Sequence, residues 1–263
     1  MSDAMHLRWQ PTTMAGAQSK TLVMGGGEVH YLHAAATANP DPDDRAAKPM
    51  ILLHGLGAGS GHWLYNIREL ARAGPVYALD LPGHGFTRLR IPWQVPHIVG
   101  FLEAFMDRLG LAQAVLAGNS LGGAIALYMA LCRPERVSHL VLAAPAALGR
   151  EVHWYLRLMA LPGLGYLLSA PWSPALRYWL PFLLVHRPLS FLRGHDRLHA
   201  YTNALNQQDN REPIDRILAG QGLLLFGQRN ISVVERMGEI KNPTLLAWGE
   251  HDRIFPVSQR RRA

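Results

Sequence analysis

Short apolar runs alternate with longer amphipathic stretches along most of the first half of the chain. Apolar runs bounded by turn residues favour buried strands, whereas apolar residues spaced three and four positions apart favour helices. The pattern predicts, in order, a hairpin over 20–34, strand 50–54, helix 63–72, strand 75–79, helix 95–109, strand 113–118, helix 121–132 and strand 136–143. Strands that alternate with helices in this way predict an α/β fold with a mostly parallel sheet and helices on both faces.

The segment 146–235 breaks this rhythm. Its helical pieces are rich in Leu, Trp and Tyr and are repeatedly interrupted by proline. Residues 158–176 carry no charge, but the three prolines and two glycines within them argue against a membrane-spanning helix. Two interpretations remain open: the apolar faces cover a substrate pocket, which we favour, or Trp154, Trp172 and Trp179 make a weak contact with a membrane surface.

The sequence G-N-S-L-G-G around Ser120 fits the pattern G-x-S-x-G of a nucleophile elbow. An apolar run, 114–117, precedes it and a second, 124–131, follows it. These flanks predict a strand, a sharp turn and a helix, which is the context that the motif requires. Gly118 and Gly122 have no Cβ, so strand and helix can pack closely around a strained serine. Ser120 is therefore the candidate nucleophile, the alternative being an ordinary serine N-cap.

Two backbone amides are candidates for an oxyanion hole. Leu121 follows the candidate nucleophile, at the start of the predicted helix. The second amide comes from the loop H-G-L-G that begins at His54, where we assign Leu56, with Gly57 as the alternative. We interpret His54 itself as a structural residue that holds this loop by hydrogen bonds.

Asp252 is the candidate acid that orients a catalytic histidine. It follows an apolar run in the sequence W-G-E-H-D-R, at the end of a predicted strand. Glu250 is the second choice, and a plain turn role for Asp252 is the alternative. Earlier in the chain Asp80 begins the turn D-L-P-G-H-G, where we expect it to anchor backbone amides.

These four motifs, in this order and spacing, resemble the α/β-hydrolase superfamily, in particular its capped esterases, lipases and carbon–carbon bond hydrolases. The resemblance covers about residues 20–258. It implies a core formed by 20–145 and 236–263, with 146–235 as a helical cap inserted between the sixth and seventh strands. It also implies a serine nucleophile, an acid after the seventh strand and a histidine after the eighth; Ser120 and Asp252 match the first two.

The histidine of the family pattern has no match in residues 1–263, since the chain continues for only 11 residues (263 − 252) beyond Asp252. We therefore expect the eighth strand and last helix to be missing, and the seventh strand to form an unpaired edge. Three explanations follow, in order of preference: a truncated or frameshifted enzyme, an inactive relative, or a replacement histidine. The histidines considered for that replacement are His54, His62, His153, His186, His195, His199 and His251.

Composition limits the remaining classes. The length of 263 residues and an apolar content of 49% suit one large domain, or one domain with an inserted cap. The single cysteine, Cys132, excludes an internal disulfide, and the N-terminus lacks the pattern of a secretion signal, so we expect a cytoplasmic protein. The net charge of +7 comes from dispersed arginines without a nucleic-acid motif, so we expect no nucleic-acid partner.

The sequence predicts a serine hydrolase of carboxylic esters that needs neither a metal nor an organic cofactor. The expected substrate is a small apolar ester or ketone. The chemical alternative is hydrolysis of a carbon–carbon bond in a vinylogous diketone, since the same fold and elbow serve both reactions. The non-enzymatic alternative is an inactive fold that binds a small apolar ligand.

Overall fold

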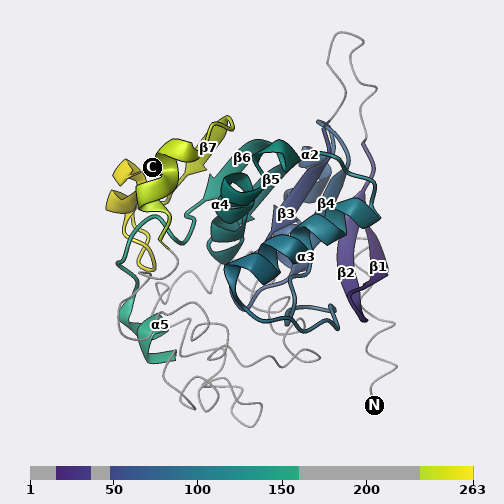
Figure 1. Ribbon diagram of the computed structural model, residues 1–263, viewed down its shortest axis with the longest axis horizontal. Coiled ribbons are helices and arrows are strands. Elements are labelled where there is room, and N and C mark those ends of the chain that lie inside the picture. Colours follow the sequence, from purple (N-terminus) through teal and green to yellow (C-terminus); the bar gives the residue numbers. More distant parts are fainter. Residues whose placement is uncertain (1–15, 37–47, 160–231, 263) are drawn as a thin grey trace.

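A seven-stranded sheet forms the centre of the chain (Figure 1). The computed structural model describes residues 16–36, 48–159 and 232–262. The strands are β1 (Gln18–Met24), β2 (Gly27–Ala34), β3 (Met50–Leu53), β4 (Val76–Leu79), β5 (Ala114–Asn119), β6 (Val137–Ala143) and β7 (Thr244–Ala247). They lie in the order β1-β2-β4-β3-β5-β6-β7, with β2 antiparallel to both neighbours and every pair from β4 to β7 parallel. The predicted mostly parallel sheet is confirmed.

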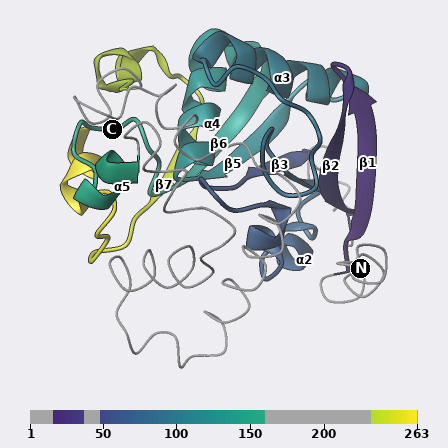
Figure 2. The same cartoon turned by 90° about the horizontal axis from the view of Figure 1, so that it is seen from below.

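The helical elements are distributed along the chain between these strands. They are η2 (Ser60–Trp63), α2 (Ile67–Leu70), α3 (Val95–Arg108), α4 (Leu121–Cys132), η3 (Pro134–Arg136), α5 (Trp154–Met159), η7 (Val234–Glu239) and η8 (Val257–Arg262), where η denotes a 3₁₀ helix. In Figure 2 α3 and α4 lie on one side of the sheet and α2 on the other.

Alternate residues of β3 belong to two different cores. Ile51 and Leu53 join the larger core with α3 and α4, whereas Leu52 joins the smaller core with Ile67 of α2. Successive side chains of a strand point to opposite faces, so a strand covered on both sides has an unbroken apolar run. This is the physical reason that the run at 50–54 predicts a central strand, and helices cover both faces as expected.

The hairpin at 20–34 forms as predicted, with β1 and β2 antiparallel in continuous register. Gly25 and Gly26 have φ of 59° and 80° and form its two-residue turn. A tight hairpin turn with positive φ at both central positions favours glycine, because side chains rarely adopt that conformation.

The predicted helix 63–72 is wrong in length. The structure has η2 there, followed by the single turn α2. Leu64 and Ile67 are buried with a spacing of three residues. That spacing also fits a 3₁₀ turn, whose i→i+3 bonds include Leu64 N–H to Gly61 O at 3.2 Å. The short helical turns therefore bury these side chains without a continuous α-helix.

β7 is one of the two edge strands of the sheet in the part of the chain that the structure describes, and β1 is the other. β7 pairs with β6, and Leu245 on it is 62% exposed. The expected edge at the seventh strand is therefore present among these residues. An exposed apolar edge strand is a template for association with another chain.

Most of the expected cap, 146–235, lies outside the described residues, which include only its first and last parts. These two parts meet, because Val233 N–H donates to Ala147 O at 2.9 Å. The two described ends of the expected cap are therefore joined by a backbone hydrogen bond. Among the described residues no helix combines the length and apolar character needed to cross a membrane.

Candidate active site

Ser120 occupies a sharp turn between β5 and α4. Its φ of 52° and ψ of −113° lie outside the regions favoured by residues with a side chain. Three hydrogen bonds hold this backbone: Ser120 N–H donates to Ala143 O at 3.1 Å, and Ser120 O accepts from Ala124 N–H at 3.1 Å and Ala146 N–H at 2.9 Å. Such strain persists where the surroundings fix it, and it is frequent at functional sites.

The glycines around the turn are required by contacts between backbones. A Cβ added at Gly118 would overlap the backbone of Gly122, and one at Gly122 would overlap the carbonyl of Leu53 at the end of β3. Strand, turn and helix therefore pack with no room for a side chain. The loop that follows β3 also lies against the turn, because a Cβ at Gly55 would be 3.3 Å from Ser120 Cβ.

Leu56 and Leu121, the predicted oxyanion-hole residues, lie in the loop after β3 and at the start of α4. Leu121 is the first residue of α4, where helical N–H groups have no acceptor within the helix. Leu56 follows Gly55 in the loop against Ser120. Within the described residues neither amide donates to a protein acceptor.

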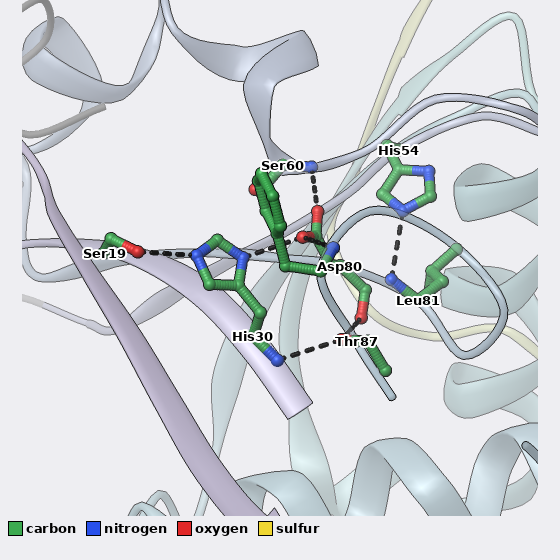
Figure 3. Close-up of polar contacts among 8 residues, drawn as sticks. Ser19, His30, His54, Ser60, Asp80, Leu81 and Thr87 are labelled. Atoms are coloured by element: carbon green, nitrogen blue, oxygen red, sulfur yellow. Dashed lines mark hydrogen bonds and ion pairs between the residues drawn. The ribbon is translucent and has the colours of Figure 1, made fainter. Parts of the chain in front are cut away.

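His54 holds the loop that carries Leu56. The imidazole is fully buried, and its Nδ1 donates to Gly55 O at 2.8 Å. Its Nε2 accepts from Leu81 N–H at 3.0 Å (Figure 3). Burial, followed by the neighbouring His84, lowers the pKa of His54 to about 3, so the ring is neutral. Gly55 C=O and Leu56 N–H belong to one planar peptide, so the bond to Gly55 also fixes the direction of the Leu56 amide.

Asp80 anchors the adjoining loops, as expected from its turn motif. The buried carboxylate accepts from the amides of Ser60 and Phe86 and from His30 Nδ1, the last at 2.7 Å. Burial alone would raise the pKa of Asp80, but His30, His54 and the Ser60 amide outweigh it and lower the pKa to about 2. The carboxylate is ionised and fixed.

Asp252 lies after β7, in a tight turn. Its Oδ1 accepts from Ile254 N–H at 2.7 Å and from Phe255 N–H at 3.0 Å, so the turn role weighed for this residue is present. The carboxyl ends of parallel strands meet at one edge of a sheet. At this edge Ala144 N–H, next to Ala143 whose carbonyl accepts from Ser120 N–H, donates to Ala247 O at the end of β7 at 2.9 Å. Asp252 therefore lies at the same edge as Ser120.

Among the described residues no histidine is hydrogen-bonded to the Ser120 hydroxyl. His54 and His84 are buried in the loops, and His251 is exposed. His153 lies near the candidate acid, because its backbone N–H donates to Ile254 O at 3.0 Å in the turn of Asp252. His186, His195 and His199 lie outside the described residues. In the described ranges, no group of three or more His, Cys, Asp or Glu side chains could hold a metal ion.

The sequence matches the profile of the alpha/beta hydrolase fold over residues 48–262. It is 33% identical over 224 residues to a 2-hydroxy-6-oxononadienedioate/2-hydroxy-6-oxononatrienedioate hydrolase of Comamonas testosteroni, covering 82% of this chain and 75% of that protein. It is 29% identical over 222 residues to the dihydrolipoyllysine-residue acetyltransferase component of the acetoin cleaving system of Cupriavidus necator. That match covers 81% of this chain and 54% of the relative, so the aligned region spans about half of it.

A solved structure with a similar fold is the 2-hydroxy-6-oxo-6-phenylhexa-2,4-dienoate hydrolase from Rhodococcus. The two agree with a TM-score of 0.71 and 22% sequence identity, over 94% of this chain and 85% of that one. At this identity the similarity concerns the fold.

Proposed function

The chain belongs to the alpha/beta hydrolase family, a family of hydrolases, and from this premise we propose that it is a serine hydrolase of carboxylic esters with Ser120 as its nucleophile. The observation that carries the proposal is the positive φ of Ser120 at the junction of β5 and α4. The surrounding hydrogen bonds maintain a conformation that an ordinary helix N-cap does not need.

In the proposed reaction Ser120 Oγ attacks the ester carbonyl, and the negative oxygen of the tetrahedral intermediate binds the amides of Leu56 and Leu121. Fixed backbone donors are effective because they need no reorganisation during the reaction, and losing one donor typically lowers kcat by about 10²–10³-fold. Asp252 is proposed to orient an imidazole through its carboxylate, which the turn amides already hold.

The proposed reaction needs a general base that takes the proton of Ser120 Oγ. His251 is the last histidine of the 263 residues, and it precedes Asp252. The backbone of His153 contacts the Asp252 turn, so His153 is the first replacement base to examine. A chain without a base retains an oxyanion hole, and such sites can keep about 10³-fold catalysis over water.

A second reaction, hydrolysis of a carbon–carbon bond in a vinylogous diketone, is favoured by one specific observation. The relative from Comamonas testosteroni, 33% identical, is named a 2-hydroxy-6-oxononadienedioate/2-hydroxy-6-oxononatrienedioate hydrolase. Both reactions use attack on a carbonyl and the same oxyanion donors. The proposed substrate of this chain remains a small apolar ester or ketone, which the apolar composition of 146–235 supports.

The segment 146–235 is proposed to form the cap over this site. The support is the hydrogen bond between Ala147 and Val233, which brings the ends of the segment together beside the loop that holds Ser120. The apolar composition of the segment suits a lining for an apolar acyl or ring group.

The test compares two substrates, p-nitrophenyl butyrate and a 2-hydroxy-6-oxo-6-phenyl dienoate, with the 263-residue chain and its Ser120→Ala variant. Turnover of the ester that Ser120→Ala abolishes supports the esterase proposal, and faster turnover of the dienoate supports the second reaction. Equal rates of chain and variant on both substrates, with and without added imidazole, would refute Ser120 as nucleophile.

Added imidazole and a His153→Ala variant then locate the base. If His153 is the base, its replacement lowers the rate and imidazole restores part of it. If residues 1–263 provide no base, imidazole accelerates the unmodified chain and leaves Ser120→Ala at background. His251→Ala is the matched control for loss of a histidine near Asp252.

A further inference from the structure

A second serine, histidine and aspartate are connected in line far from Ser120 in the sequence (Figure 3). Ser19 Oγ lies 2.8 Å from His30 Nε2, and His30 Nδ1 lies 2.7 Å from Asp80 Oδ2. Ser19 comes from β1, His30 from the neighbouring β2, and Asp80 from the end of β4. Both distances are within the hydrogen-bonding range of a nucleophile, a base and the group that orients the base.

The proton positions follow from the acceptor at one end. Asp80 is ionised and can only accept, so the Nδ1 atom of His30 carries the proton of that hydrogen bond. When the imidazole is neutral, Nε2 is the unprotonated nitrogen and can accept the hydroxyl proton of Ser19, whose Oγ lies 2.8 Å away. This is the arrangement in which a histidine can remove the proton of a serine.

Burial differs sharply along the line. Asp80 is 0% and His30 4% exposed, whereas Ser19 is an exposed residue of the outermost strand. Further contacts fix the imidazole: His30 N–H donates to Thr87 Oγ1 at 2.9 Å, and the ring meets Phe86 edge-on at 5.1 Å between centroids. A base that is held rigidly and shielded from water therefore faces a hydroxyl that solutes can reach.

We propose that Ser19 is a second nucleophilic serine of this chain, activated by His30 and Asp80 and open to small activated acyl or phosphonyl donors from solution. Ser19 Oγ forms a bond to the acyl carbon as the bond to the leaving alcohol breaks. The serine proton passes to His30 Nε2 and then to the departing alkoxide, so the products are an acylated Ser19 and an alcohol. Neither Ser120 nor the proposed cap takes part in this step.

The experiment uses the full 263-residue chain with Ser120→Ala, so that the proposed active site contributes no label. The probe is a small alkyl phosphonofluoridate, which reacts by forming an Oγ–P bond and releasing the fluoride with the serine proton. Peptide mass spectrometry measures the rate of labelling at each serine. Ser258 is the internal control, because it is an exposed serine and no histidine within 16–36, 48–159 and 232–262 is hydrogen-bonded to it.

Ser19 is expected to be labelled about 10²-fold faster than Ser258, as general-base assistance gives 10²–10⁴-fold. His30→Gln in the same chain should reduce the rate at Ser19 to that of Ser258, and Thr21→Ala, which removes another exposed hydroxyl of β1, should not change it. Equal labelling of Ser19 and Ser258 in the Ser120→Ala chain would overturn the proposal, and this comparison holds even if His30→Gln fails to fold. Labelling of Ser120 in the unmodified chain tests the proposed function separately.

Discussion

Because of His54, acid should destabilise this protein at pH values well above the range in which carboxylates usually titrate. The pKa of His54 is lowered from 6.5 to about 3 in the folded chain, chiefly by burial. Below about pH 6.5 the unfolded chain therefore binds a proton that the folded chain excludes. The contribution of His54 is complete above 6.5 and is lost as the pH falls toward 3.

The magnitude follows from the pKa difference. At 1.36 kcal/mol per unit, the whole interval corresponds to roughly 5 kcal/mol, and roughly 3 kcal/mol is lost by about pH 4. This is a large part of the 5–15 kcal/mol typical of domains. Burial also lowers the pKa of His84, which acts in the same direction. Asp80, with its pKa lowered to about 2, contributes stability that begins to fall only below about 3.8, so it does not affect this window.

The assay is urea unfolding followed by tryptophan fluorescence in steps from about pH 7 to about pH 4. Below about pH 6 we expect the free energy of unfolding to fall by at least about 1.36 kcal/mol per pH unit, which corresponds to one proton taken up on unfolding. His54→Gln should reduce the slope of unfolding free energy against pH by the equivalent of about one proton. His251→Gln, at an exposed histidine, should leave that slope unchanged. A free energy of unfolding that stays constant between about pH 6.5 and 4 would refute the burial of a neutral His54.

Three substitutions test the packing around the elbow and the sheet edge. Ser120→Gly should abolish turnover yet raise the free energy of unfolding by about 1 kcal/mol, because glycine relieves the strain at φ 52°. A lower free energy of unfolding for this variant, measured by chemical denaturation, would contradict the strain. Gly122→Ala should lower the thermal midpoint or prevent folding, because its Cβ would overlap Leu53 O, whereas Gly100→Ala, with no atom within 4 Å of its added Cβ, should be tolerated; equal midpoints would contradict this packing. Leu245→Lys should change stability by less than about 0.5 kcal/mol and reduce association in light scattering, since this exposed side chain lies on the edge strand; unchanged association would show that the edge is not the contact.

Much of the fold could be predicted because local pattern and tertiary packing agree. The run at 50–54 becomes a central strand whose alternate residues enter both cores, and the glycines of the elbow meet backbone on every side. The helix at 63–72 was predicted wrongly in length, because spacings of three residues do not separate an α-helix from successive 3₁₀ turns.

The site could be predicted only where its signal is local. Ser120, Leu56 and Leu121 follow from short motifs, and the turn of Asp80 likewise. The line from Ser19 through His30 to Asp80 joins positions 11 and 50 residues apart and was missed, since no sequence motif spans those separations. The contact between His153 and the Asp252 turn joins two segments that are distant in the sequence, so it could not be predicted from a local motif either.

The most direct test of the central claim is to locate the covalent adduct that an alkyl phosphonofluoridate forms with the unmodified chain. The account predicts an adduct on Ser120, mapped by peptide mass spectrometry, that is absent from the Ser120→Ala variant and whose formation coincides with loss of esterase activity. Complete loss of activity with Ser120 unlabelled, or retention of activity with Ser120 fully labelled, would contradict the assignment of this serine as the nucleophile.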